Sequence, residues 1–220
     1  MNLFDILGPV MVGPSSSHTA GAVKIGMVAR RLLGDAPVQA HILLHGSFAS
    51  TGNGHGTDRA LVAGLLGMEP DDLRIPKSLE LAEDVGMHVR FGSVHLRGAH
   101  PNTASLSLKS KNGRELQMVA SSLGGGRIQV CQIDGVTTNF SGEYNTLVVH
   151  NQDQPGYVAL VATVLAQHNV NIATMQVFRE TSGRFAVMVV ECDQPIPRDV
   201  VESLEPVHGI LKVSYMNVEG

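Results

Sequence analysis

The first part of the chain shows a helical hydrophobic pattern and then a strand-like one. Apolar residues recur at helical spacing after residue 20, and Gly34 ends that pattern. We therefore predict an amphipathic helix with the apolar members Ala22, Ile25, Ala29, Leu32 and Leu33. From Val38 to Leu44 every second residue is apolar, which predicts a strand. A second helix is expected next, with Thr57 or Asp58 as its cap and an apolar face made of Ala60, Leu61, Gly64, Leu65 and Met68.

Residues 87–134 show the alternation that is typical of a sheet. Alternating runs flank Asn112-Gly113, and this dipeptide in that setting is the strongest short-range signal of a β-hairpin. Residues 137–145 are polar and rich in chain-breaking residues, so we predict a linker there. The first domain is therefore expected to span residues 1–136.

Residues 146–220 follow a second and clearer pattern. A strand, a helix, two strands, a short helix opened by Pro197 and a final strand are predicted in that order. The order β-α-β-β-α-β is that of the ferredoxin-like fold. The sequence thus predicts an α+β protein, with an N-terminal α/β domain followed by a ferredoxin-like domain.

Composition narrows the possible functions. The 220 residues carry a formal net charge of −4 and scattered basic residues, which argues against nucleic-acid binding. No apolar run is long enough to span a membrane, and the first residues lack a signal-peptide pattern, so a cytoplasmic protein is expected. Cys131 and Cys192 are far apart and are expected to be reduced thiols. Two such cysteines cannot build an iron–sulfur or zinc site, so we predict no metal centre in this chain.

The stretch Gly13-Pro14-Ser15-Ser16-Ser17-His18-Thr19 directly precedes the first predicted helix. Its serines can cap the helix, and the first N–H groups of a helix are free to bind an anion. Two interpretations stay open. The stretch is either a site for a carboxylate or phosphate, or simply a well-capped helix start.

A glycine-rich loop at residues 46–58 connects the predicted strand to the second helix. Four glycines in eleven residues allow the backbone to come close to a small ligand, and His55 lies between two of them. No Gly-Lys-Ser/Thr follows, so the loop is not a P-loop. The histidine at the mouth of a helix favours a functional role; the alternative is a flexible connection that happens to contain it.

Two further polar motifs interrupt the predicted strands, His100-Pro101-Asn102-Thr103 and Ser121–Gly126. Three consecutive glycines are costly in a strand unless the backbone must approach something closely. A bulge or a hairpin bend is the alternative interpretation.

With Asp-x-Pro-Gly at 153–156 and Asn171-Ile172 opening its second strand, the C-terminal domain (146–220) resembles an ACT domain, a small amino-acid-sensing module. The whole chain resembles the β chain of bacterial iron–sulfur-dependent L-serine dehydratases. The first domain is also similar to the allosteric substrate-binding domain of some D-3-phosphoglycerate dehydrogenases. The resemblance is carried by the ACT domain and by the motifs at 13–19, 46–58, 100–103 and 122–126.

The resemblance implies a lyase of amino-acid metabolism and gluconeogenesis that converts L-serine to pyruvate and ammonia. In that family a separate α chain, or a fused α domain, carries a [4Fe–4S] cluster, so this subunit is expected to be inactive alone. His55 is the expected base, with His18 as the other candidate or as a hydrogen-bond partner, since imidazole titrates near neutral pH. Asp58 could orient an imidazole. The residues expected to bind the substrate are Ser15, Ser16, Ser17, Thr19, Thr57, Asp58, Asn102, Gly124 and Gly125.

The resemblance also implies self-association through the ACT domain, with a ligand group made of Asn151, Asp153, Gly156 and Asn171. Asn151 stands where related domains often place a histidine. The ligand therefore stays open among an amino acid, a monovalent cation and none. The alternative function is a non-catalytic regulatory module that binds serine or a small phosphorylated acid, as in the phosphoglycerate dehydrogenases.

Overall fold

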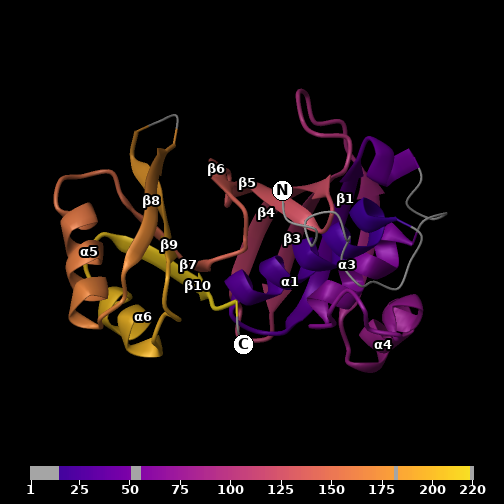
Figure 1. Ribbon diagram of the computed structural model, residues 1–220, viewed down its shortest axis with the longest axis horizontal. Coiled ribbons are helices and arrows are strands. Elements are labelled where there is room, and N and C mark those ends of the chain that lie inside the picture. The colour runs from indigo at the N-terminus through magenta and orange to yellow at the C-terminus, as the bar shows by residue number, and fades with distance from the viewer. Residues whose placement is uncertain (1–14, 51–55, 181–182, 219–220) are drawn as a thin grey trace, which may run out of the picture. The chain divides into compact units, whose positions relative to one another are not determined.

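The computed structural model describes residues 15–50, 56–180 and 183–218 (Figure 1). The chain divides into two compact units, Met1–Cys131 and Gln132–Gly220. Each unit has its own hydrophobic core. No helix within the described ranges is both long and apolar enough to cross a membrane.

A mixed sheet forms the centre of the first unit. The six-stranded order is β2-β1-β3-β4-β5-β6, of which β6 belongs to the second unit; β1 is parallel to β2 and antiparallel to β3, and β3 is antiparallel to β4. Alternate side chains of β1, β3 and β4 are buried, which gives the sheet one apolar face. The strands are β1 (Pro37–His45), β2 (His88–Ser93), β3 (Thr103–Ser110), β4 (Glu115–Gly124), β5 (Arg127–Ile133) and β6 (Val136–Phe140).

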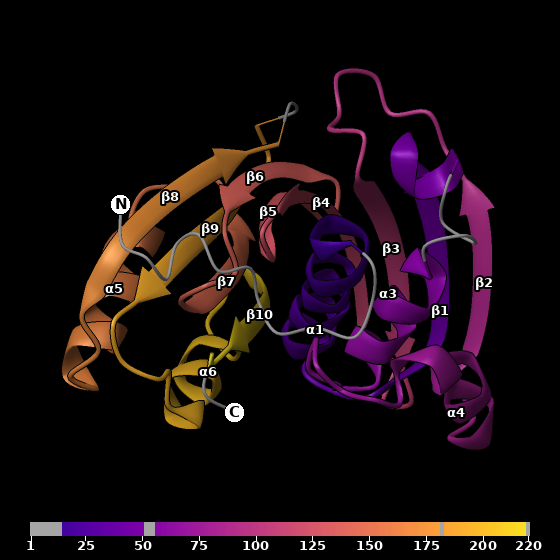
Figure 2. The same cartoon turned by 45° about the vertical axis from the view of Figure 1, so that its right-hand side comes forward.

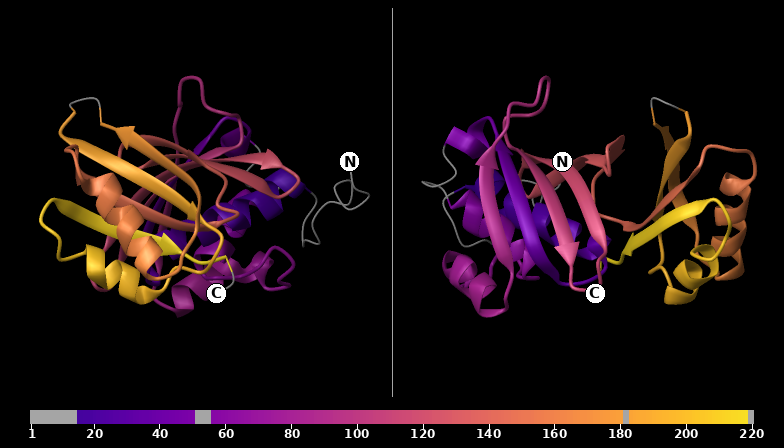
Figure 3. Two further views of the ribbon diagram at one scale, coloured as in Figure 1. Left: turned by 60° about the vertical axis from the view of Figure 1, so that its left-hand side comes forward. Right: turned by 180° about the vertical axis from the view of Figure 1, so that it is seen from behind.

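Helices lie along the apolar face of this sheet (Figure 2). The opposite face of β1 to β4 is seen from behind in Figure 3, where no helix crosses it. The helices of this unit are η2 (Ser16–Ala20), α1 (Gly21–Leu33), α3 (Thr57–Leu65), η3 (Ile75–Lys77) and α4 (Ser78–Asp84).

Two glycines let α1 and α3 cross in backbone contact. A Cβ atom on Gly26 of α1 would press against the carbonyl oxygen of Leu61, and one on Gly64 of α3 would press against that of Val23. Both helices are almost entirely buried along their lengths. Their separation is therefore set by backbone rather than by side chains.

The predicted elements of the first unit are confirmed in kind, with one correction. The hairpin at Asn112-Gly113 joins β3 to β4, and Gly113 has the positive φ of 81° that such turns require. The predicted cap of the second helix is wrong. Gly56, in the left-handed conformation, is the N-cap, and Thr57 is already the first helical residue. That helix ends at Leu65, so Met68 is buried outside it.

The second unit contains the predicted β-α-β-β-α-β order. Its four strands form an antiparallel sheet in the order β10-β7-β9-β8. Both helices pack on one face and share a core of leucine, isoleucine, valine, methionine and Cys192 side chains. The elements are β7 (Asn145–Gln152), α5 (Tyr157–Gln167), β8 (Ile172–Arg179), β9 (Phe185–Cys192), α6 (Arg198–Leu204) and β10 (Ile210–Met216).

Strand β6 includes residues 137–140 of the segment predicted as a linker. Phe140 is buried, and the Gln176 side-chain amide of β8 donates to the Asn139 carbonyl at 3.3 Å. Lys212 Nζ of β10 lies 2.6 Å from Asp134 Oδ2, just before β6. These residues are therefore anchored on the second unit and are not a free connection.

Candidate functional site

The first serine-rich motif forms one wide helical turn that leads into α1. Ser15 has extended backbone, and its hydroxyl accepts a hydrogen bond from the His18 amide at 3.3 Å. Residues 16–20 then form a short π-helix, in which the Thr19 amide donates to the Ser15 carbonyl at 2.8 Å. Single π-turns are often found at functional sites because they place side chains where an α-helix cannot.

The His18 imidazole is fixed by hydroxyl groups on both of its nitrogens. Nδ1 lies 3.3 Å from the hydroxyls of both Ser15 and Ser17, and Nε2 lies 3.3 Å from the hydroxyl of Ser47. The ring is 9% exposed and stands edge-on to Phe48, with a centroid distance of 5.3 Å. A hydroxyl can donate or accept, so this setting suits either neutral tautomer. The imidazole can therefore donate a hydrogen bond from one nitrogen and accept one at the other within this hydroxyl cluster.

Ser47 and Phe48 reach His18 because β1 ends in a sharp turn. Gly46 has a φ of 57°, and a Cβ atom there would lie 2.6 Å from the carbonyl oxygen of Pro101. A single helical turn at residues 47–50 follows, and the Phe48 amide donates to that same carbonyl at 3.4 Å. The second motif is thereby packed directly on the His-Pro-Asn-Thr motif.

The His-Pro-Asn-Thr motif is held in turn by hydrogen bonds to β4. The Thr103 hydroxyl donates to the His100 carbonyl at 2.6 Å and lies 2.7 Å from the Ser121 hydroxyl. The Asn102 carbonyl accepts from the Ser122 amide at 2.8 Å. Both Thr103 and Ser121 are buried, so this polar pair is a fixed base beneath the motif.

The triple glycine is the bend between β4 and β5, as one of its two interpretations required. All three residues have positive φ, and nothing lies within 4 Å of a Cβ atom added to Gly124 or Gly125. The bend nevertheless reaches the first motif, because the Gly125 amide donates to the Ser16 hydroxyl at 3.4 Å. A Cβ atom on Gly21, at the start of α1, would collide with the Ser122 side chain.

Two hydroxyl groups at this convergence have no hydrogen-bond partner in the described part of the chain. They belong to Thr57, in the first turn of α3, and to Ser122, and both residues are completely buried. A buried polar atom without a partner costs free energy, so such atoms mark a place where a ligand or water completes the bonding. Gly56, the N-cap of α3, has no side chain to cap the helix, and the Arg59 amide of the first turn is bonded to the Asp58 carboxylate at 2.8 Å.

Most of the residues expected to bind the substrate are therefore brought together. The Thr57 hydroxyl is buried at this place. The Asp58 carboxylate, next to it in the chain, accepts a hydrogen bond from the Arg59 amide at 2.8 Å. His55 lies outside the described residues. Ser47 lies within the glycine-rich loop, but the sequence pattern predicted no role for it and did not predict the pairing of Thr103 with Ser121.

The residues of this chain do not fit an iron–sulfur cluster. Cys131 lies in the first unit and Cys192 in the second, whereas such clusters are held by three or four thiolates. Burial, with Asp193 and Glu191 nearby, raises the pKa of the Cys192 thiol to about 11, which disfavours the thiolate that a metal requires. Within residues 15–50, 56–180 and 183–218, no three His, Cys, Asp or Glu side chains gather as a metal site.

Three of the four residues expected to bind a ligand in the second unit border one cavity of about 510 Å³ at the β7–α5 loop. Asn151 is 3% exposed; its amide nitrogen donates to the Gln152 carbonyl at 2.7 Å, while its Oδ1 has no partner among the described residues. Asp153 pairs with Arg179 at 3.1 Å, and Gly156 is the N-cap of α5.

Asn171 is not part of this group within one chain. It precedes β8 at the end that pairs with Cys192, whereas the cavity lies at the other end of β8, where Arg179 pairs with Ala186. Its amide side chain donates to Asp193 at 2.6 Å.

Comparison with known proteins identifies the family. Residues 2–87 match the model described as "Serine dehydratase beta chain", and residues 145–209 match the ACT domain. The chain is 40% identical over 213 residues to the "Probable L-serine dehydratase, beta chain" of Bacillus subtilis, covering 97% of this chain and 96% of that protein. It is 38% identical to the "L-serine dehydratase, beta chain" of Peptoniphilus asaccharolyticus, covering 98% and 97%.

A D-3-phosphoglycerate dehydrogenase of Archaeoglobus fulgidus is 26% identical over 90% of this chain, which covers 37% of that protein. This weaker match spans only a minor part of the larger enzyme. The two beta-chain relatives are matched along almost their whole length. The chain therefore belongs to the family of L-serine dehydratase beta chains.

Proposed function

We propose that this chain joins an α chain to convert L-serine to pyruvate and ammonia, and that its hydroxyl-rich site binds the serine substrate. The observation that carries the proposal is the convergence of four separated motifs around His18, with two buried hydroxyls left unpartnered beside them. When bound in the α chain, a [4Fe–4S] cluster would supply a Lewis acid. A cytoplasmic enzyme fits this metabolic role.

The residues of this chain would supply the polar contacts for the substrate. The N-terminus of α3, which lacks a capping side chain, and the hydroxyl groups of Ser15 to Ser17 suit a carboxylate or an ammonium group. The hydroxyls of Thr57 and Ser122 would gain the partner that they lack. Such fixed donors bind developing charge without having to reorganise, which is the usual source of electrostatic catalysis.

Removal of the α proton of serine requires a base, and two imidazoles are available. His55 keeps the role of base that the glycine loop suggested. We assign His18 a second acid–base role: it would hold a proton at Nε2 or Nδ1 and pass it on, while orienting the three hydroxyls that lie 3.3 Å from its nitrogens.

The ACT unit is proposed to bind L-serine as a regulatory ligand and to pair with a second copy. A cavity bordered by an unpartnered amide oxygen and the uncapped start of an 11-residue helix suits the ammonium and carboxylate ends of an amino acid.

The subunit assignment is tested by reconstitution under anaerobic conditions. The isolated chain should release no pyruvate from L-serine, and addition of a cluster-loaded α chain should start turnover, because the two cysteines here cannot hold the cluster. Pyruvate release by the chain alone would refute the assignment. A chain that stays inactive with α chain but binds serine would favour the regulatory alternative suggested by the dehydrogenase relative.

Replacement of His18 should distinguish a role in proton transfer from a purely structural role in stabilising the fold. His18→Ala should lower turnover of the reconstituted complex by roughly 10²–10⁴-fold, the usual contribution of acid–base catalysis. His18→Gln can still bond Ser47 but cannot exchange a proton, so it should restore stability without restoring turnover. His208→Ala, at an exposed position, is the matched control and should change neither quantity. Near-normal turnover of folded His18→Ala would remove this residue from the active site.

The unpartnered hydroxyl of Thr57 predicts opposite effects on stability and on substrate binding. Thr57→Val keeps the shape but removes the unsatisfied oxygen, so the free energy of unfolding should rise by about 1 kcal/mol. In the complex, KM for L-serine should rise about tenfold, because the substrate loses a hydrogen bond. Thr103→Val is the control, since that hydroxyl is bonded at 2.6 Å and its loss should lower stability. A less stable Thr57→Val with unchanged KM would contradict the proposal.

The ACT ligand is tested by calorimetry with L-serine on the full chain. Asn151→Ala should abolish the heat of binding, because Asn151 Oδ1 borders the cavity without a partner. If the ligand is held within one chain, Asn171→Ala should bind normally; if the site is shared between two copies, both variants should fail. No heat from the unaltered chain with either L-serine or potassium would leave assembly as the role of this unit.

A further inference from the structure

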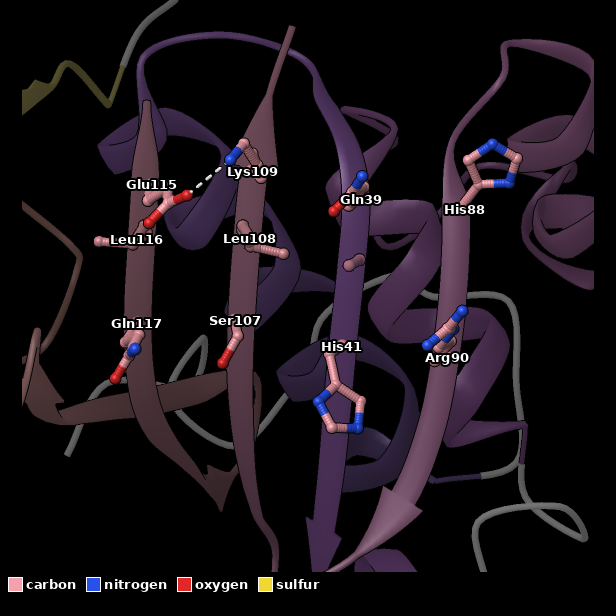
Figure 4. Close-up of a pocket in the computed structure, with 11 residues that line it drawn as sticks. Gln39, His41, His88, Arg90, Ser107, Leu108, Lys109, Glu115, Leu116 and Gln117 are labelled. Atoms are coloured by element: carbon pink, nitrogen blue, oxygen red, sulfur yellow. Dashed lines mark hydrogen bonds and ion pairs between the residues drawn. The ribbon is translucent and has the colours of Figure 1, made fainter. Parts of the chain in front are cut away.

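A polar hollow of about 550 Å³ lies on the helix-free face of the first unit's sheet (Figure 4). It is lined by residues of β1 to β4 at the Gln39 and Lys109 end of the strands. The serine-rich site lies toward the other end, where His45 of β1 is opposite Thr103 of β3. The hollow is thus distinct from the site described above.

Strand register places cationic and polar side chains in two rows across this face. In one row Arg90 of β2 stands directly opposite His41 of β1, and His41 is opposite Ser107 of β3. In the next row His88 is opposite Gln39, which is opposite Lys109. Residues directly opposite each other across strands have their Cβ atoms about 5 Å apart. We call this set, completed by Gln117 beside Ser107, the cationic groove.

The positive charge of the cationic groove is only partly neutralised. Glu115 is its one carboxylate, and it is turned toward Lys109, with 2.8 Å between Oε1 and Nζ (Figure 4). In the part of the chain that the structure describes, no carboxylate pairs with Arg90. Arg90 is exposed on this face, and unlike Lys109 it has no carboxylate beside it among the described residues, so it is the cation of the groove to which an anionic ligand can bind.

We infer that the cationic groove binds a small dianion, a phosphate ester or a dicarboxylate. Arg90 can form two parallel hydrogen bonds to an oxyanion, which an ammonium group cannot do. The Ser107 hydroxyl and the Gln117 amide, in the same row, can donate to its remaining oxygens. This inference does not depend on the proposed reaction, because it concerns another end of the sheet and other residues.

The test is calorimetry of the full chain at low ionic strength with sulfate, inorganic phosphate and succinate as separate probes. At least one should bind with 1:1 stoichiometry, and Arg90→Gln should weaken it about tenfold or more, as expected for charged hydrogen bonds. Arg198→Gln is the matched control: it makes the same change at an exposed arginine of the second unit, and should bind normally. The preferred probe distinguishes a phosphoryl from a carboxylate ligand.

A second variant makes the test independent of any damage to folding. Glu115→Gln frees Lys109 from its exposed ion pair, so it should tighten dianion binding about threefold, in line with the weak energy of such pairs. Absence of binding by all three probes would overturn the inference. Equal binding by the unaltered chain and Arg90→Gln, or weaker binding by Glu115→Gln, would also overturn it, because the anion would then lie elsewhere.

Discussion

The crossing of α1 and α3 is the contact on which the geometry of the first unit depends. Gly26 and Gly64 let backbone meet backbone, so the two helices cannot slide past each other without a collision. The serine-rich turn precedes α1 and Thr57 begins α3, so this crossing fixes two motifs that are about 40 residues apart in sequence. Gly21 allows a similar close approach, because the absence of a side chain there leaves room for Ser122.

The site that results is costly for a free subunit. The four motifs of the site are hydrogen-bonded to one another through hydroxyl and amide groups. Thr57 and Ser122 nevertheless bury hydroxyl oxygens that have no partner among the described residues. A protein can carry such unsatisfied groups because packing elsewhere outweighs them, and they are usually retained where they act on a ligand. Thr103 and Ser121, the latter next to Ser122 in the chain, are by contrast bonded to each other at 2.7 Å. Motifs held by hydrogen bonds to one another, together with buried oxygens that still lack a partner, are what a preorganised binding site requires.

The fold could be predicted from sequence where local signals and burial agree. The helical stripe before Gly34, the Asn112-Gly113 hairpin and the order of elements after residue 145 all have short-range causes, and the structure contains them. The cap of α3 was missed because a glycine N-cap in the left-handed conformation gives no side-chain signal. The strand over 136–140 was hidden because its polar alternation reads as a linker until the hydrogen bond from Gln176 is seen.

The site illustrates the same limit more sharply. Each motif could be identified as polar and unusual, but sequence spacing does not tell that Ser47 reaches His18 or that Gly125 reaches Ser16. Those contacts follow from the topology, in which β1 lies beside β3 and β3 beside β4, so that the ends of three strands meet. The same holds for His41 and Arg90, which lie opposite each other only because of the parallel register of β1 and β2.

One sheet therefore presents two different chemical environments, and its strand ends explain why they can coexist. Near His45 and Thr103 the polar groups are buried and bond to protein, as a site that excludes water requires. Near Gln39 and Lys109 the polar groups are exposed, and their charges are screened by solvent. Strands β1 and β3 each carry residues of both regions, so one sheet holds the two environments at opposite ends of the same strands.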